Sequence, residues 1–120
     1  MPDETKWTDA LAKLIKKTEA GEVKWGPSPL PALIREDAVG GVIYFTAIQG
    51  RGLIVYEYTY KSYSVDVDSW IDDREVSIEF VDTAGNLQWR WPKLDQRSQL
   101  LDAIRYQLAG ANEFLERFLA

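Results

Sequence analysis

The chain has 120 residues, a net charge of −5 at pH 7, and neither histidine nor cysteine. The lack of cysteine excludes disulfides and thiolate metal sites, and the lack of histidine removes the commonest general base and the commonest metal ligand. Most hydrolase triads and most zinc sites are therefore excluded in this chain alone. The acidic balance also argues against nucleic-acid binding, because phosphates require clustered Lys and Arg.

Length and composition predict a single domain over residues 1–120. The hydrophobic content of 46% is that of a globular protein that can bury a core. The polar start MPDETKW is unlike a signal peptide, and no apolar run approaches the roughly 18 residues of a membrane span. We therefore expect a cytoplasmic protein that needs neither a membrane nor a cofactor.

The first predicted element is an amphipathic helix over residues 4–20, where apolar residues recur at helical spacing. Asp3 or Thr5 is the expected N-cap, and Gly21 suits the left-handed residue that often follows a helix. Residues 22–25 are expected to form a short edge strand. We interpret the GPSPLP segment that follows as a stiff connector rather than as a proline-rich ligand for a partner.

Residues 42–60 carry the strongest strand signal and predict a hairpin that turns near Gly50 and Gly52. Its register stays open, because a slip of one residue exchanges the two faces. A two-residue loop at Gly50 and Arg51 groups on one face Ile43, Phe45, Ala47, Ile54, Tyr56 and Tyr58. A three-residue loop with Gly52 left-handed groups instead Val42, Tyr44, Ile48, Ile54, Tyr56, Tyr58 and Tyr60.

Residues 61–68 alternate and predict a further strand or a continuation of the previous one, and residues 69–74 are expected to form a polar loop. A second hairpin is predicted over residues 75–91, with a four-residue loop at 83–86. This loop pairs Phe80 with Trp89, Ile78 with Trp91, and Glu79 with Arg90. The apolar members then share one face and the opposite charges share the other.

A long C-terminal helix is predicted from about Asp95 to Leu119, with Gly110 inside it marking a bend or a close contact. The predicted fold is therefore α+β: an N-terminal helix, a four- or five-stranded mainly antiparallel meander sheet, and a long C-terminal helix. Because each helix has one apolar stripe, we expect both helices on one face of the sheet.

Two sequence blocks are distinctive: the first is Leu11-x-x-Leu14-Ile15-x-x-Thr18-x-x-Gly21-x-Val23-x-Trp25, and the second is Ile104-Arg105-x-Gln107-x-x-Gly110. They resemble those of short, stand-alone bacterial proteins of unknown function. The turn from Asp82 to Asn86 resembles theirs too, and the likeness covers roughly a third of the chain. It implies a helix, antiparallel sheet and helix architecture, and no assigned activity.

The candidate binding surface is a cluster of aromatic residues, Tyr56, Tyr58, Tyr60, Tyr63 and Trp70. Aromatic side chains with few partners mark protein interfaces. On this interpretation the chain is a non-enzymatic interaction protein that binds a protein partner or itself, through an aromatic sheet face or an edge strand. The alternative, that these side chains pack as core beneath the helices, stays open.

Two other functions are weighed against self-association. Glu57 lies between Tyr56 and Tyr58, and burial would raise its pKa, so a tyrosine-lined pocket around it would suit a small ligand or a minor enzyme activity. The acids of residues 66–75 suggest a divalent-metal module, although their spacing does not fit a calcium loop. A solvated acidic face explains the same residues.

Overall fold

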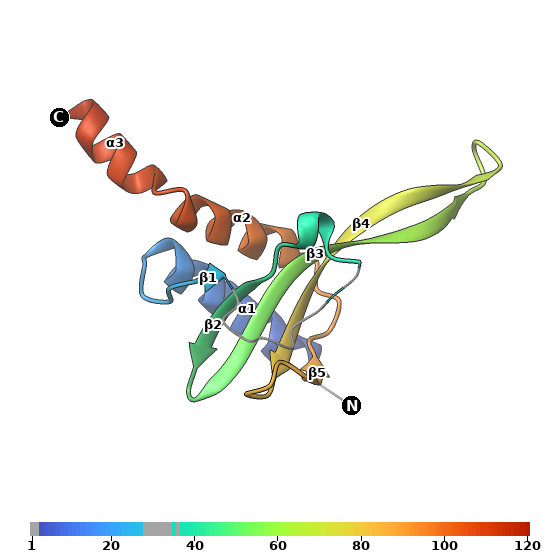
Figure 1. Ribbon diagram of the computed structural model, residues 1–120, viewed down its shortest axis with the longest axis horizontal. Coiled ribbons are helices and arrows are strands. Elements are labelled where there is room, and N and C mark those ends of the chain that lie inside the picture. Colours follow the sequence, from blue (N-terminus) through green and yellow to red (C-terminus); the bar gives the residue numbers. More distant parts are fainter. Residues whose placement is uncertain (1–2, 28–34, 36) are drawn as a thin grey trace.

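The chain folds as an N-terminal helix, a five-stranded sheet and two C-terminal helices in a computed structural model that describes residues 3–27, 35 and 37–120 (Figure 1). The elements in chain order are α1 (Glu4–Glu19), β1 (Gly26–Pro27), the 3-10 helix η1 (Val39–Gly41), β2 (Tyr44–Ile48), β3 (Arg51–Ser64), β4 (Ser69–Val81), β5 (Leu87–Arg90), α2 (Arg97–Leu108) and α3 (Ala111–Leu119). Most of the GPSPLP segment lies outside the described residues, so its interpretation as a connector stays a prediction.

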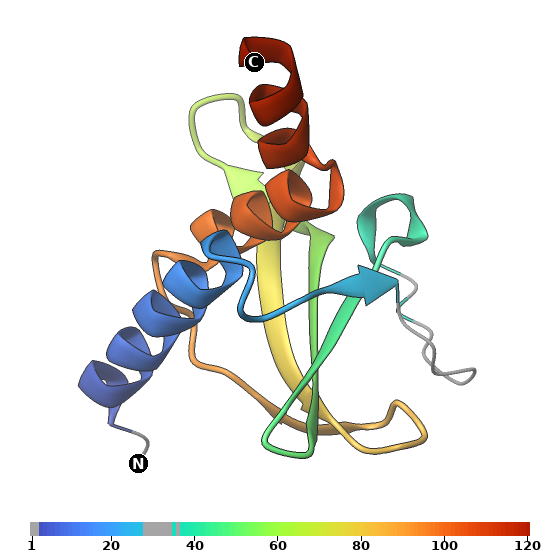
Figure 2. The same cartoon turned by 90° about the vertical axis from the view of Figure 1, so that its left-hand side faces the viewer.

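The sheet is an antiparallel meander in the order β1-β2-β3-β4-β5. Helices α1 and α2 lie together on one of its faces (Figure 2), so the predicted α+β fold is confirmed. The first strand was predicted at residues 22–25, which is wrong. The pairing with β2 begins only at Gly26, because the backbone of the preceding residues is hydrogen-bonded to α2.

Helix α1 follows the sequence pattern closely. The Asp3 carboxylate accepts a hydrogen bond from the Thr5 amide at 3.0 Å, and Gly21 adopts the left-handed conformation just after the helix, with φ of 76°. The buried side chains of α1 are Leu11, Leu14 and Thr18. They pack with α2 and with the apolar side chains of β3 and β4 that face the helices, including Leu53, Val55 and Ile78.

The hairpin of β2 and β3 turns through Gln49 and Gly50, whose φ values of 53° and 76° suit a tight two-residue loop. Phe45 pairs with Ile54 and Tyr44 with Val55. The loop lies one residue earlier than Gly50 and Arg51, which moves the pairing by two positions and leaves the faces unchanged. The apolar set that the two-residue loop predicted, with Phe45, Ile54 and Tyr56 on the face away from the helices, is therefore correct.

Strand β4 is longer than its sequence pattern indicated. Glu79 pairs with Arg90 and Phe80 with Trp89, as predicted, and a bulge follows Phe80. Residues 69–74 were predicted to be a polar loop, which is wrong, because they are the first half of β4 and pair with β3 as far as Ser64. Strands β3 and β4 together form a two-stranded ribbon that runs past the helices and past the other strands (Figure 1). We call residues 59–74 the arm.

The arm gives the molecule an elongated outline. Its extents are 53 × 35 × 33 Å and its radius of gyration is 16.0 Å, whereas a compact domain of this length has a radius of gyration of about 13–14 Å. The C-terminal helix adds to the elongation at the other end. Gly110 has φ of 67° and divides the helix into α2 and α3, where a continuous helix with a bend had been expected. Of the two, only α2 contributes buried residues.

One side chain joins the sequence block at residues 11–25 to the block at residues 104–110. The Gln107 amide nitrogen donates to the carbonyl oxygens of Thr18 at 2.9 Å and Val23 at 2.8 Å, and its oxygen accepts from the Trp25 amide at 2.8 Å. The Trp25 indole in turn donates to the Thr18 hydroxyl. These residues therefore fasten the segment after α1 to α2, which is a structural role.

Candidate functional site

Tyr56, Tyr58 and Tyr60 of β3 lie on the face of the sheet that is turned away from the helices. Tyr63 lies on the opposite face of the same strand, because side chains alternate along a strand, so the predicted aromatic cluster is divided between two faces. Tyr56 is 2% exposed, and its hydroxyl donates to Glu79 at 2.6 Å. Tyr58 is half-buried and donates to Glu75 at 2.8 Å. Tyr60, at 36% exposure, stands at the start of the arm. The exposure of this row of tyrosines therefore rises outward along β3, and Tyr56 is not available to a partner.

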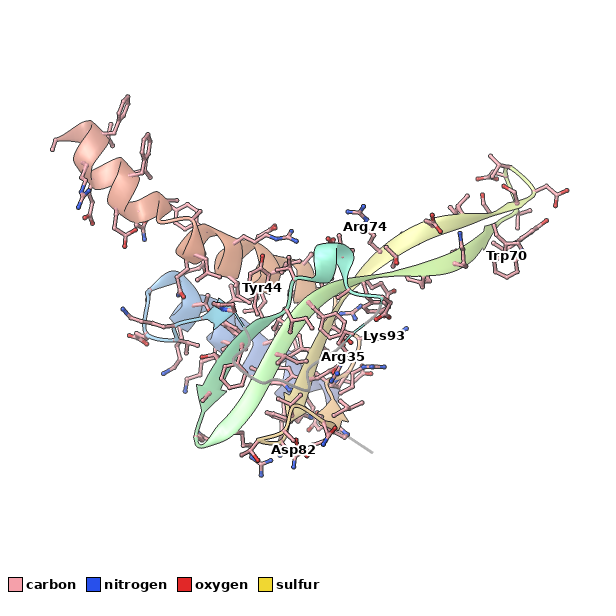
Figure 3. The ribbon with its side chains drawn as sticks, viewed as in Figure 1. Arg35, Tyr44, Trp70, Arg74, Asp82 and Lys93 are labelled. Atoms are coloured by element: carbon pink, nitrogen blue, oxygen red, sulfur yellow. The ribbon has the colours of Figure 1, made fainter. Side chains whose placement is uncertain are left out.

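The centre of this face is a buried carboxylate. Glu79 is fully buried and accepts hydrogen bonds from Tyr56, from Ser77 at 2.8 Å, from Arg35 at 3.0 Å and from Arg90 at 3.2 Å. Arg35 lies over the middle of the sheet (Figure 3). Both carboxylate oxygens are occupied, so Glu79 binds the segment before η1 to the sheet and has no free oxygen for acid–base chemistry.

The buried contact between Glu79 and Tyr56 shifts the pKa of both groups. Burial alone raises the pKa of Glu79, but hydrogen bonds from Tyr56, Ser77 and Arg35 outweigh it and hold the pKa below its usual value. Burial, together with the hydrogen bond to Glu79, raises the pKa of Tyr56 to about 12. Both shifts favour the ionised Glu79 beside a neutral Tyr56, which is the arrangement that stabilises the fold.

The arm carries the most exposed aromatic residues of the predicted cluster. Tyr63 and Trp70 pair across the two strands, with ring centroids 5.5 Å apart, and are 46% and 66% exposed. Figure 3 shows Trp70 at the far end of the arm. Near them the apolar side chains of Val65, Val67 and Ile71 are 84%, 63% and 42% exposed. We call these five residues the arm tip. No residue of the arm, all of which is described, is buried.

A second uncovered apolar surface lies on α3. Phe114 and Phe118 stack with their ring centroids 5.3 Å apart and are 61% and 73% exposed. Leu115 and Leu119 flank them at 44% and 77% exposure. None of the residues of α3, all of which are described, is buried. A helix with one apolar stripe and no cover is typical of an interaction surface rather than of a core element.

The alternative site around Glu57 is not formed as predicted. Glu57 lies on the helix face of the sheet, 3.8 Å from Arg74 and 3.6 Å from Arg105. Tyr56 and Tyr58 point to the opposite face, because side chains alternate along a strand. The expected tyrosine lining is therefore wrong, and Glu57 is explained by its two ion pairs.

The acids of residues 66–75 do not form the cluster that the metal-module alternative requires. Nowhere in the described part of the chain do three or more Asp and Glu side chains gather closely enough to hold a metal ion. The acids of residues 66–75 are spread along the arm and its turn. Asp72 pairs with Lys61, Asp73 accepts from Tyr60, and Asp68 accepts from Tyr63. They bind neighbouring side chains of the ribbon instead of converging.

Sequence reasoning missed one contact on this face of the sheet and one feature of the C-terminal helices. It paired Glu79 with Arg90 but did not identify Arg35, which is 44 residues away and has no local signal. It also assigned the apolar residues of α3 to a packed stripe. The left-handed preference of Gly110 was the one available signal that the stripe is interrupted.

Three comparisons with known proteins were made: no protein-family model, no curated protein and no solved structure matches the chain. The resemblance of the two sequence blocks to bacterial proteins therefore stays a prediction. Among the described residues, no helix has both the length and the apolar composition that crossing a membrane requires.

Proposed function

We propose that this chain is a cytoplasmic, non-enzymatic interaction protein whose partner is a second copy of itself. The observation that carries the proposal is the arm, a two-stranded ribbon with no buried residue that holds five apolar side chains at its tip. An isolated ribbon of two strands is marginally stable in water, so its persistence in a native protein favours a partner that covers it. A cytoplasmic location rests on the lack of cysteine, and a bacterial source rests on the resembling sequence blocks.

The position of α3 identifies a surface that suits the arm tip. In Figure 1 both rise above the body of the molecule, α3 at the left and the arm tip at the right. A two-fold rotation that brings a second copy onto this side sets the α3 of each copy beside the arm of the other. The two contacts are then equivalent, and the assembly closes as a dimer without leaving a further copy of either surface exposed.

The exposed area is sufficient for such a dimer. The arm tip and the apolar stripe of α3 together expose about 1,000 Å² of side-chain surface per copy, so two copies offer about 2,000 Å², the upper end of the ~1,200–2,000 Å² that a stable interface buries. Trp70, Phe114 and Phe118 are the aromatic anchors that such interfaces concentrate at their centre. Tyr60 lies at the start of the arm, on the other face of the ribbon from Tyr63, and Tyr56 and Tyr58 support the sheet on that face.

Sedimentation velocity tests the proposal. The wild-type chain is expected to sediment as a dimer, and Trp70→Ser on the arm or Phe118→Ser on α3 is expected to give a folded monomer. Leu87→Ser is the matched control, because Leu87 is 47% exposed at the start of β5, away from both surfaces. A wild-type chain that stays monomeric at high concentration refutes self-association.

Mixing the two variants tests which surfaces meet. In the proposed dimer the arm of each copy contacts the α3 of the other. A Trp70→Ser chain paired with a Phe118→Ser chain therefore retains one complete contact, between the intact α3 of the Trp70→Ser chain and the intact arm of the Phe118→Ser chain. Equimolar mixing is therefore expected to restore part of the dimer that neither variant forms alone. If Trp70→Ser dimerises like the wild type while Phe118→Ser does not, the helices pair with each other and the arm has a different role.

A further inference from the structure

A groove of about 430 Å³ runs between α1 and the turn that joins β2 to β3, away from the arm and α3. This volume lies in the range of ~300–1,000 Å³ that is usual for small-ligand sites. Its walls come from α1, β2, β3, β4 and the end of the second hairpin, so it is built on packed elements rather than on a loop. Its lining separates into an aromatic floor and a basic rim.

The floor is a cluster of aromatic rings. Trp7 lies with its ring centroid 4.7 Å from that of Trp91 and 6.2 Å from that of Phe80, and Phe80 and Trp91 are 5.7 Å apart. All three residues line the groove. Such a floor offers flat apolar contact to an aromatic or aliphatic body, because each ring presents a face or an edge.

The rim carries three positive charges and no negative one. Lys13, Lys17 and Arg51 line the groove, and no Asp or Glu of the described residues does. Lys17 is 3.8 Å from Glu22, but neither Lys13 nor Arg51 has a carboxylate partner within the described part of the chain. The Arg51 guanidinium lies 5.6 Å from the centre of the Phe80 ring. This concentration of cations, two of them without a carboxylate partner among the described residues, stands out in a chain whose net charge is −5.

The wall of the groove also contains an unpaired donor. Trp91 is 8% exposed, and its indole nitrogen is the one buried side-chain polar atom of the described residues that has no hydrogen-bond partner. A buried N–H without an acceptor costs about 1–3 kcal/mol, so native structures keep few of them.

We propose that the groove binds a small aromatic organic acid, with its ring on the floor of Trp7, Phe80 and Trp91 and its acid group among Lys13, Lys17 and Arg51. The rim discriminates against the quaternary ammonium ligands that aromatic cages usually recognise, because their charge is repelled there. A neutral aromatic compound fits the floor but leaves the cations unused. The site is distinct from the self-association surfaces and does not depend on the dimer.

Indole resonances of the ¹⁵N-labelled protein test the site with 8-anilinonaphthalene-1-sulfonate as the probe acid. The chain has five tryptophans, so each wild-type spectrum contains its own controls. The N–H signals of Trp7 and Trp91 are expected to shift on titration, while those of Trp25 and Trp70 stay in place. A shift of Trp70 without one of Trp7 or Trp91 would place the probe on the arm tip and overturn the proposal, as would the absence of any shift.

The charge requirement is tested with N-phenyl-1-naphthylamine, which has the same rings without the sulfonate. The double variant Lys13→Gln, Arg51→Gln is expected to weaken binding of the sulfonate about tenfold or more, which corresponds to ~1.4 kcal/mol, and to leave binding of the neutral compound within about twofold. Lys6→Gln, Lys16→Gln removes the same charge from exposed positions of α1 outside the groove. Equal weakening in this control, or equal affinity of the wild type for both compounds, contradicts the proposed site.

Discussion

Replacing Gln107 with leucine should remove the junction between α2 and the segment that follows α1. Leucine keeps much of the volume of glutamine but neither donates nor accepts hydrogen bonds. The Trp25 amide and the carbonyl groups of Thr18 and Val23 then lose the partners that they have at 2.8–2.9 Å. Each bond contributes about 1 kcal/mol net, so we expect the free energy of unfolding to fall by roughly 2–3 kcal/mol, because the site is partly open to water.

Urea denaturation followed by tryptophan fluorescence measures this loss, and Gln99→Leu is its control on the exposed side of α2. A domain of this size has about 5–15 kcal/mol of stability, so the variant still folds. Hydrogen exchange supplies a local readout, because the amide of Trp25 should lose its protection while the amides of β3 keep theirs. If Gln107→Leu costs no more than Gln99→Leu and Trp25 stays protected, the assigned bonds do not hold these segments together.

Two further predictions concern the buried carboxylate and the helix joint. The folded-state pKa of Glu79 lies below the unfolded value of ~4.3, so its stabilisation is complete above that pH and is lost as pH falls through the folded value. Glu79→Gln should therefore show lower stability at neutral pH and a flatter acid profile than the wild type, and parallel profiles in an acid denaturation series would refute this. Gly110→Ala, at φ of 67°, should cost about 1 kcal/mol or more. Gly26→Ala is the control, because the backbone there is extended and an added Cβ atom would meet nothing within 4 Å, so the melting temperature should be nearly unchanged. Equal losses of stability in the two variants would contradict the backbone strain expected for alanine at position 110.

The sequence predicts those elements that both bury one face and carry their own end signals. Helix α1 is an example, because the Asp3 cap, the apolar spacing and Gly21 agree on the same boundaries. The pairing of Glu79 with Arg90 is another, because the apolar alternation on either side of the loop admits one consistent register. Such signals are local, so one sequence is enough to identify them.

The same reasoning does not identify elements that bury nothing. Residues 69–74 have no hidden face, and their polar composition resembles that of a loop although they form a strand. The stripe of α3 has a helical period whether or not a partner covers it. The contact of Arg35 with Glu79 spans 44 residues and depends on the path of the intervening chain. Each of these three features depends on the tertiary arrangement, which the spacing of residues along the chain does not reveal.

The bonds of Gln107 have a consequence for the order in which the chain acquires its structure on the ribosome. They join residues that are 82 to 89 positions apart, and α2 is synthesised after α1 and all five strands. Helix α1 therefore has no α2 to pack against until the chain has been translated through Leu108. In the meantime Leu11 and Leu14 lack their final cover, and the nascent chain is the form most exposed to chaperones and proteases.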